Sequence, residues 1–279
     1  MSRRPARPEA LGSIDLSQFL VFLVVDNVEK STGLTRQSVD KGGVVINKTL
    51  ASCSDAVASV FDGATVMIGG FGEPGVPGRL IEALRQQGAT NLVVIHNGAG
   101  FHDFGLAGLI KDGRVRKLVA SFPNYPSASA FRERYLKGET ELELVPQGTL
   151  IERIRAAGAG LGGFYTRTAV GTELAAGKET RIIQGRPYVF ETPLHADFAL
   201  LKADRADRLG NLTYRYAMRN FNPIMATAAS RVIAEVERLV PVGALTADEI
   251  HTPGIFVDHI VEIDRDPRLF EPRYEETAT

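Results

Sequence analysis

Glycines between residues 62 and 77 give the densest chemical signal in the sequence. Gly70, Gly72 and Gly75 have the spacing G-x-G-x-x-G, after a predicted strand and before a predicted helix. Glycines at a strand-to-helix turn leave backbone N–H groups open to a phosphate, a carboxylate or a thioester oxygen. The segment therefore predicts a loop that binds an anion or an oxyanion. The alternative is a tight turn in which the glycines have only a conformational role.

The same spacing is typical of a dinucleotide-binding loop, but two features disfavour NAD. A Rossmann site needs an acidic residue at the end of the second strand to bind the ribose hydroxyls, whereas this sequence has His96, Asn97 and Gly98 there. Pro74 and Pro77 also stiffen the loop where it should turn smoothly into its helix. We therefore expect no nicotinamide cofactor.

Two other glycine patterns resemble nucleotide sites only superficially. A second G-x-G-x-x-G begins at Gly158, but it follows a predicted helix rather than a strand. Residues 171–179 resemble a phosphate loop, but six residues separate Gly171 from Lys178, and Glu179 stands where serine or threonine must hold magnesium. Neither pattern predicts a nucleotide site.

The chain contains none of the familiar catalytic or metal-binding sets. Its histidines form no i, i+4 pair and no H-E-x-x-H motif, and there is no G-x-S-x-G. The histidines are His96, His102, His195, His251 and His259. The carboxylates near glycine-rich turns, which fit solvated or capping roles better than catalysis, are Glu73, Asp103, Glu173 and Glu191. The sequence predicts no metal site and assembles no nucleophile, base and oxyanion site within this chain.

Alternating strands and helices must position these loops. Apolar runs predict strands over residues 64–69, 91–96, 116–122 and 141–145. Amphipathic segments predict helices over residues 78–87, 104–111, 128–136 and 148–157, the last with Thr149 as its N-cap. Further strands are predicted over residues 188–191, 198–202, 212–215, 231–236 and 255–261, with one helix over 223–229. This alternation predicts a single α/β domain with a mostly parallel sheet flanked by helices, whose loops gather ligands at one edge.

Composition excludes several classes of protein. The 279 residues carry 32 Lys and Arg against 33 Asp and Glu, so no basic field exists to hold nucleic acid or an anionic membrane. The longest apolar run, residues 19–25, is far shorter than the ~20 residues of a membrane span. The single cysteine, Cys53, allows no intrachain disulfide and fits a reducing cytoplasmic location. In a predicted helix, it is interpreted as a small core residue rather than a nucleophile.

The two ends of the chain differ in pattern from its middle. Residues 1–45 contain a Pro- and Arg-containing opening and a polar stretch without clear periodicity, so we expect an N-terminal extension with little order. Residues 264–279 predict a loose C-terminal tail. The domain is therefore expected over residues 46–263, and Val45 is a candidate for the true translation start.

Several stretches, in order along the chain, resemble one known family. Residues 62–77 match a pattern of D-G, an apolar run, G-G-F and G-x-P, which resembles the A subunit of family I CoA-transferases. Further matching stretches lie at residues 144–150, 152–155, 157–163, 171–172, 197–202, 210–214, 219–223 and 252–256. The resemblance covers about residues 46–263 and is strongest to 3-oxoadipate and acetoacetate CoA-transferases. It implies the CoA-transferase fold.

The resemblance accounts for the missing catalytic set. Family members move CoA between carboxylates by a ping-pong route, through an acyl-enzyme anhydride and a glutamyl-CoA thioester. The glutamate belongs to a partner B subunit, in a serine-glutamate-asparagine-glycine type of motif that this sequence lacks. The resemblance therefore implies an A2B2 complex in which this chain supplies half of the site and is inactive alone. It implies no cofactor, since the CoA thioester is a substrate.

The glycine loop and two polar residues are the candidate substrate- and CoA-binding positions. Backbone N–H groups of the loop suit a carboxylate or thioester oxygen. Asn97 and Gln147 follow strands at the expected ligand edge, and Phe71 and Pro77 are candidates for the wall of a pantetheine tunnel that excludes water. The candidate residues are Gly69, Gly70, Phe71, Gly72, Gly75, Pro77, Asn97 and Gln147.

The substrate is predicted less directly than the family. The Ser121-Phe122-Pro123 stretch resembles 3-oxoadipate enzymes, which implies transfer from succinyl-CoA to 3-oxoadipate. The alternative is transfer from succinyl-CoA or acetyl-CoA to acetoacetate. The arginines that could bind a second carboxylate are Arg132, Arg134 and Arg219. Many relatives have a small uncharged residue in place of Glu73, and we expect this carboxylate to point to solvent.

Two further functions remain as alternatives. A sugar-phosphate isomerase or deaminase on a related fold would need an acid and a base beside a phosphate loop, and the sequence shows none. A non-catalytic ligand-binding protein would form stable homo-oligomers without a partner.

Overall fold

The computed structural model describes residues 46–100, 104–124 and 128–264. The expectations for residues 1–45 and for most of the C-terminal tail, as well as His102 and Asp103, lie outside these ranges. The chain divides into two units, Met1–Val45 and Ile46–Thr279, and the description below concerns the second.

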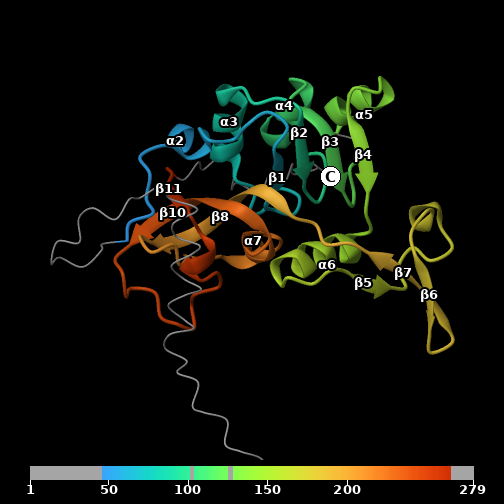
Figure 1. Cartoon of the computed structure of the whole chain (residues 1–279). Coiled ribbons are helices and arrows are strands. Elements are labelled where there is room, and N and C mark those ends of the chain that lie inside the picture. The colour runs from blue at the N-terminus through green and yellow to red at the C-terminus, as the bar shows by residue number, and fades with distance from the viewer. Residues whose placement is uncertain (1–45, 101–103, 125–127, 265–279) are drawn as a thin grey trace, which may run out of the picture. The chain divides into compact units, whose positions relative to one another are not determined.

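A mostly parallel sheet forms the centre of this unit, which confirms the predicted fold class (Figure 1). Its strand order is β11-β10-β8-β1-β2-β3-β4, with every neighbouring pair parallel, and the short strand β9 pairs antiparallel with β8. The strands are β1 (Thr65–Ile68), β2 (Leu92–Ile95), β3 (Val115–Ala120), β4 (Glu141–Leu144), β8 (Ala196–Asp207), β9 (Leu212–Thr213), β10 (Ala229–Val240) and β11 (His259–Glu262).

Helices cover both faces of this sheet because successive strand residues point to opposite faces. In β1, Val66 and Ile68 pack into the core beneath α2, α3, α4 and α5, while Met67 packs on the other side with α6 and α7. The helices are α2 (Cys53–Val57), α3 (Gly78–Gln87), α4 (Gly105–Lys111), α5 (Ser129–Leu136), α6 (Gln147–Gly158) and α7 (Asn222–Ala226). The short 3-10 helices are η1 (Glu173–Ala175), η2 (Tyr216–Arg219) and η3 (Gly254–Phe256).

The direction in which successive strands are added to the sheet changes at β1. From β1 it moves outward through β2 and β3 to β4, crosses back along α6, and then builds β8, β10 and β11 on the other side of β1. In open parallel sheets, ligands bind at the carboxyl ends of the strands beside such a reversal. The glycine loop that follows β1 lies at this position.

A second sheet was not predicted. It is antiparallel, with the order β5-β7-β6, and consists of β5 (Phe164–Thr166), β6 (Thr180–Ile183) and β7 (Arg186–Glu191). Only β7 was predicted. Strand β6 was missed because it is mostly exposed and therefore lacks an apolar face. Gln184 and Gly185, both with positive φ, form the two-residue turn between β6 and β7.

Two local predictions were wrong. Thr149 does not cap α6: the helix begins at Gln147 after an extended Pro146, and Thr149 is its third residue, with a buried side chain. The segment 255–261 is not one strand, because η3 follows Pro253 and β11 begins only at His259. In both places a proline fixes φ near −60° and sets the local boundary.

Candidate active site at the carboxyl edge of the sheet

The glycine loop joins β1 to α3 over residues 69–77. Gly70, Gly72 and Gly75 have φ values of 111°, 64° and 77°, in the region that favours glycine. Within the described residues, nothing accepts a hydrogen bond from the N–H of Gly70, and the N–H of Gly72 makes only a long contact of 3.4 Å with Asn97 Oδ1. These two N–H groups are therefore available to an external acceptor.

The side chain of Asn222, at the start of α7, holds this loop. It is fully buried, and its Oδ1 accepts a hydrogen bond from the backbone N–H of Lys202 at 3.0 Å. Its Nδ2 donates to the carbonyls of Gly75 and Met218 at 3.1 and 2.8 Å. Asn220 adds a hydrogen bond from its Nδ2 to Pro74 O at 2.9 Å. The loop is thus fixed to β8 and η2 by side chains distant in sequence.

A buried ion pair fixes the other end of the loop, where α3 begins. Glu235, on β10, accepts hydrogen bonds from the N–H groups of Arg79 and Leu80 at 2.8 and 2.9 Å. The Lys202 ammonium lies 3.4 Å from the other carboxylate oxygen of Glu235. Burial raises the pKa of Glu235, while the Lys202 charge and the two N–H donors act in the opposite direction. A carboxylate at a helix N-terminus is favourably placed toward the helix dipole.

Three polar side chains meet beside the glycine loop, after β2, after β3 and at the start of α6. Asn97 Nδ2 donates to Gln147 Oε1 at 2.9 Å and lies 3.3 Å from Ser121 Oγ. The Ser121 hydroxyl lies 2.6 Å from Gln147 Oε1 and 3.0 Å from Asn97 O, and its single proton can serve one of these acceptors at a time. We call Asn97, Ser121 and Gln147 the amide cluster.

The amide cluster fixes the orientation of the Gln147 side chain. Its Oε1 accepts from within the cluster, whereas no described residue accepts from its Nε2. Gln147 is exposed, so this Nε2 can donate to a carboxylate or an acyl oxygen. The site therefore presents donors from both the amide cluster and the glycine loop.

His96 reinforces this edge of the sheet. Complete burial lowers the pKa of His96, so the imidazole is neutral. Its Nδ1 lies 2.8 Å from the carbonyl oxygen of Ile68, and as the donor it joins the ends of β2 and β1.

The structure gathers most of the candidate binding residues of the sequence in one place. Gly72 contacts Asn97, which contacts Gln147. Gly69, Gly70 and Gly75 belong to the same loop, and Phe71 on it is 48% exposed. Pro77, by contrast, is buried at the N-cap of α3 and does not present an open wall.

Ser121 was not among the candidate binding residues. The prediction placed it inside a strand over residues 116–122, whereas β3 ends at Ala120 and leaves Ser121 in the loop at the same edge as Asn97.

The other acidic candidates differ in burial. Glu191 is buried and pairs with Lys178 Nζ at 2.6 Å, and Glu73 and Glu173 are exposed. Within residues 46–100, 104–124 and 128–264, no group of three potential metal ligands occurs. No helix in these ranges is both long and apolar enough to span a membrane.

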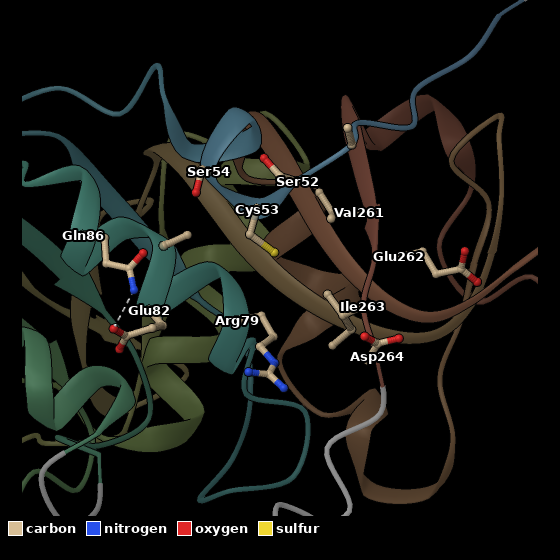
Figure 2. Close-up of a pocket in the computed structure, with 12 residues that line it drawn as sticks. Ser52, Cys53, Ser54, Arg79, Glu82, Gln86, Val261, Glu262, Ile263 and Asp264 are labelled. Carbon is tan, nitrogen blue, oxygen red and sulfur yellow. Dashed lines mark hydrogen bonds between the residues drawn. The ribbon is translucent and has the colours of Figure 1, made fainter.

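A concave region lies between α2, α3 and the end of β11 (Figure 2). Its volume is about 410 Å³, and it shares no residue with the amide cluster. Cys53 lines it together with Arg79 and Glu82. Burial, together with the nearby charge of Glu235, raises the pKa of the Cys53 thiol to about 11.

Cys53 is therefore expected to be a poor nucleophile. Iodoacetamide at pH 8 should label it about 10- to 100-fold more slowly in the folded protein than in the urea-unfolded chain, because the thiolate is the reactive form and burial depletes it. Cys53 is the only cysteine, so total labelling followed by mass spectrometry reports this site alone. Equal rates in the two states would contradict the interpretation of Cys53 as a structural residue.

These features define a class of protein. The chain is an α/β protein that presents backbone and amide donors for a carboxylate or acyl oxygen at a sheet reversal. The described residues supply no nucleophile and base beside those donors.

The family follows from comparison with known proteins. A family model for coenzyme A transferases matches residues 50–263, and the chain belongs to that family as a family I A subunit, which confirms the resemblance. The A subunit of the 3-oxoadipate CoA-transferase of Pseudomonas putida is 54% identical over 219 residues, which are 78% of this chain and 95% of the relative.

Two further proteins illustrate the range of relatives. The A subunit of a probable succinyl-CoA:3-ketoacid coenzyme A transferase of Bacillus subtilis is 47% identical over 216 residues, which are 77% of this chain and 90% of the relative. The crystal structure of glutaconate coenzyme A-transferase from Acidaminococcus fermentans matches with a TM-score of 0.66 at 20% identity, over 78% of this chain and 76% of that chain. The latter supports the fold.

Proposed function

We propose that this chain is the A subunit of a 3-oxoacid CoA-transferase that moves CoA from succinyl-CoA to 3-oxoadipate. The observation that carries the proposal is the amide cluster beside a glycine loop with open N–H groups. The name of the P. putida relative supports 3-oxoadipate as the acceptor. The name of the B. subtilis relative supports the alternative, a 3-oxoacid such as acetoacetate.

In this mechanism the acyl-CoA carbonyl carbon is attacked by a glutamate of the partner B subunit. The carbon–sulfur bond breaks, and an acyl-glutamyl anhydride and the CoA thiolate form. The thiolate then attacks the glutamyl carbonyl, which gives the glutamyl-CoA thioester and releases the carboxylate of the donor acid. The acceptor acid reverses these steps. Negative charge develops on carbonyl oxygens in each step, and preorganised N–H donors stabilise it.

In these reaction steps, the residues of this chain bind and orient the reacting groups. The N–H groups of Gly70 and Gly72 and the Nε2 of Gln147 donate to the reacting carboxyl or acyl oxygen. Asn97 and Ser121 hold Gln147 so that its donor side faces outward. Exclusion of water by the assembled complex protects the anhydride and thioester from hydrolysis.

Exposed aromatic side chains beside the glycine loop support the presence of a partner subunit. Phe71 is 48% exposed, and Tyr216, in the segment that holds the loop, is 91% exposed with a φ of 50°. Large apolar groups left open at a site indicate a surface that another chain covers. We propose that the B subunit covers it, in an A2B2 complex.

Co-expression with a candidate B subunit tests the function. The complex should transfer CoA from succinyl-CoA to a 3-oxoacid, and each chain alone should be inactive. Activity of this chain alone would contradict the proposal and direct attention to Glu73 and Glu191. Failure of the complex with every 3-oxoacid tested would refute the 3-oxoacid assignment.

Gln147 gives a residue-level test. Gln147→Ala in the complex should lower kcat/KM for the acceptor about 100-fold, the magnitude expected when a donor to a developing oxyanion is removed. Gln86→Ala, on the exposed face of α3, is the control and should leave kcat/KM unchanged. A loss below about threefold for Gln147→Ala would show that Gln147 does not touch the reacting oxygen.

A further inference from the structure

An apolar groove opens next to the amide cluster, between the ends of β3 and β4 and the helix α5. Its volume is about 520 Å³, within the range of small-molecule sites. The apolar side chains that line it are Phe122, Phe131, Tyr135, Leu136, Leu142 and Leu144. Phe122, at its rim, is 58% exposed.

The groove is continuous with the amide cluster through Ser121. Ser121 lines the groove, and its hydroxyl lies 2.6 Å from Gln147 Oε1. The last residue of β4, Leu144, also lines it, three positions before Gln147. A ligand whose reacting carboxyl group contacts Gln147 can therefore extend along the apolar side chains of the groove.

One charged side chain lines this apolar groove. Arg132, on α5, is the only charged residue among the described residues that form it. Within the described ranges Arg132 makes no ion pair and no side-chain hydrogen bond. Its neighbours on α5 behave differently: Arg134 pairs with Glu139 at 3.1 Å, and Glu133 pairs with Lys137 at 2.6 Å. Arg132 thus offers an uncompensated guanidinium to whatever occupies the groove.

From these observations we propose that the groove binds the non-reacting part of the acyl group and that Arg132 binds a second carboxylate on it. The ligand class is a linear dicarboxylic acid or its mono-CoA ester, with one carboxyl group at the amide cluster, an alkyl chain against the groove, and the other carboxylate at Arg132. A guanidinium suits this role, because it pairs with a carboxylate through two parallel hydrogen bonds. The inference rests on the proposed CoA-transferase function and specifies its substrate.

The structure separates Arg132 from the other arginines considered from the sequence. Arg134 is engaged with Glu139 and does not line the groove. Arg219 lies in η2, on the β8 side of the glycine loop, and does not line the groove either. Of these three arginines, Arg132 alone lines the groove, and within the described ranges its exposed guanidinium makes no ion pair.

Acceptor selectivity in the complex with the B subunit tests the proposal. In a ping-pong reaction, kcat/KM for the acceptor acid reports only the second half-reaction. The choice of CoA donor therefore does not affect the comparison between acceptor acids. For Arg132→Gln, the ratio of kcat/KM for 3-oxoadipate to that for acetoacetate should fall about 10- to 100-fold, because a charged hydrogen-bond partner of one carboxylate is lost. Arg132→Lys keeps the charge and should give an intermediate ratio.

The control is Arg116→Gln. It removes one exposed positive charge near the start of β3, at the amino ends of the parallel strands. It should leave the selectivity ratio unchanged. An unchanged ratio for Arg132→Gln would overturn the proposal, as would dissociation of the complex, which would assign the groove to the B subunit. A wild-type complex that transfers CoA to acetoacetate but not to 3-oxoadipate would also overturn it while leaving the transferase function standing.

Discussion

Replacing Gly69 with alanine is expected to lower kcat of the complex by at least about 100-fold. A Cβ at this position would lie 1.9 Å from Asn222 Oδ1 and 2.7 Å from Asn222 Cγ, far inside van der Waals contact. Asn222 has no room to yield, because it is fully buried and makes three hydrogen bonds. The added methyl group must therefore displace either Asn222 or the glycine loop, and both changes move the N–H donors of Gly70 and Gly72.

A double-mutant cycle distinguishes this mechanism from simple damage to the fold. Asn222→Ala should itself lower kcat, since the carbonyls of Gly75 in the loop and Met218 in η2 lose the hydrogen bonds that Asn222 Nδ2 donates to them. In that background the alanine at position 69 no longer meets the amide, so it should add little further loss. The two effects should thus be strongly non-additive, as expected for residues in direct contact.

Gly162→Ala is the matched control for the glycine substitution. Gly162 does not have a positive φ, and nothing lies within 4 Å of its added Cβ, so activity should be unchanged. Steady-state kinetics on the complex, with circular dichroism to verify folding, measures all four variants. Full activity of Gly69→Ala would show that the glycine loop does not need this geometry, and additive losses would show that Asn222 does not transmit the effect.

Local pattern was sufficient to predict the strands and helices that build the site. Helix α3 has the predicted bounds, Gly78–Gln87, because its apolar residues recur at helical spacing and Gly88, with a φ of 99°, ends it. The four strands β1 to β4 are short apolar runs between turn residues, and each was located to within two residues at either end. Strand β6 was missed since its stability comes from pairing with β7 rather than from an apolar face.

The contacts within the site, unlike the strands and helices, could not be predicted from local sequence pattern. Asn97 and Gln147 were predicted as individual candidates, but their direct hydrogen bond and the part of Ser121 depend on three loops that meet only in the folded sheet. Asn222 lies in a stretch that resembles the family, yet its function is a hydrogen bond to a carbonyl 147 positions away. Arg132 illustrates the same limit, because its sequence position does not reveal that its neighbours on α5 are paired and it is not.

Replacing Glu235 with glutamine is expected to lower the free energy of unfolding by about 3–5 kcal/mol. Glutamine keeps an oxygen for the N–H groups of Arg79 and Leu80, so the change isolates the charge. The Lys202 ammonium, whose side chain is 4% exposed, then loses the carboxylate that compensates it. Removing one member of a buried pair costs more than removing both, because it leaves an uncompensated buried charge.

The double substitution Lys202→Met with Glu235→Gln tests this reasoning. It removes both charges and keeps the volume of the side chains similar, so it should recover most of the stability that either single substitution loses. Urea unfolding, with the midpoint and slope compared across the three variants and the unsubstituted protein, measures the coupling. A double variant that loses the sum of the two single losses would show that the pair contributes through packing and not through charge.

The Lys202→Met variant should also acquire a distinct pH dependence. Burial already raises the pKa of Glu235 above its ordinary value of 4.5, and loss of the Lys202 charge raises it further. A carboxyl group with a raised folded-state pKa favours folding below its unfolded pKa, and this contribution is lost as the pH rises through the folded pKa. The variant should therefore lose stability more steeply than the unsubstituted protein as the pH rises above about 4.5, the ordinary pKa of the group. The double variant, which lacks the carboxyl group, should not show this additional slope.

Because Glu235 caps α3 where the glycine loop ends, the same pH rise should loosen the loop in Lys202→Met and lower kcat in parallel with stability.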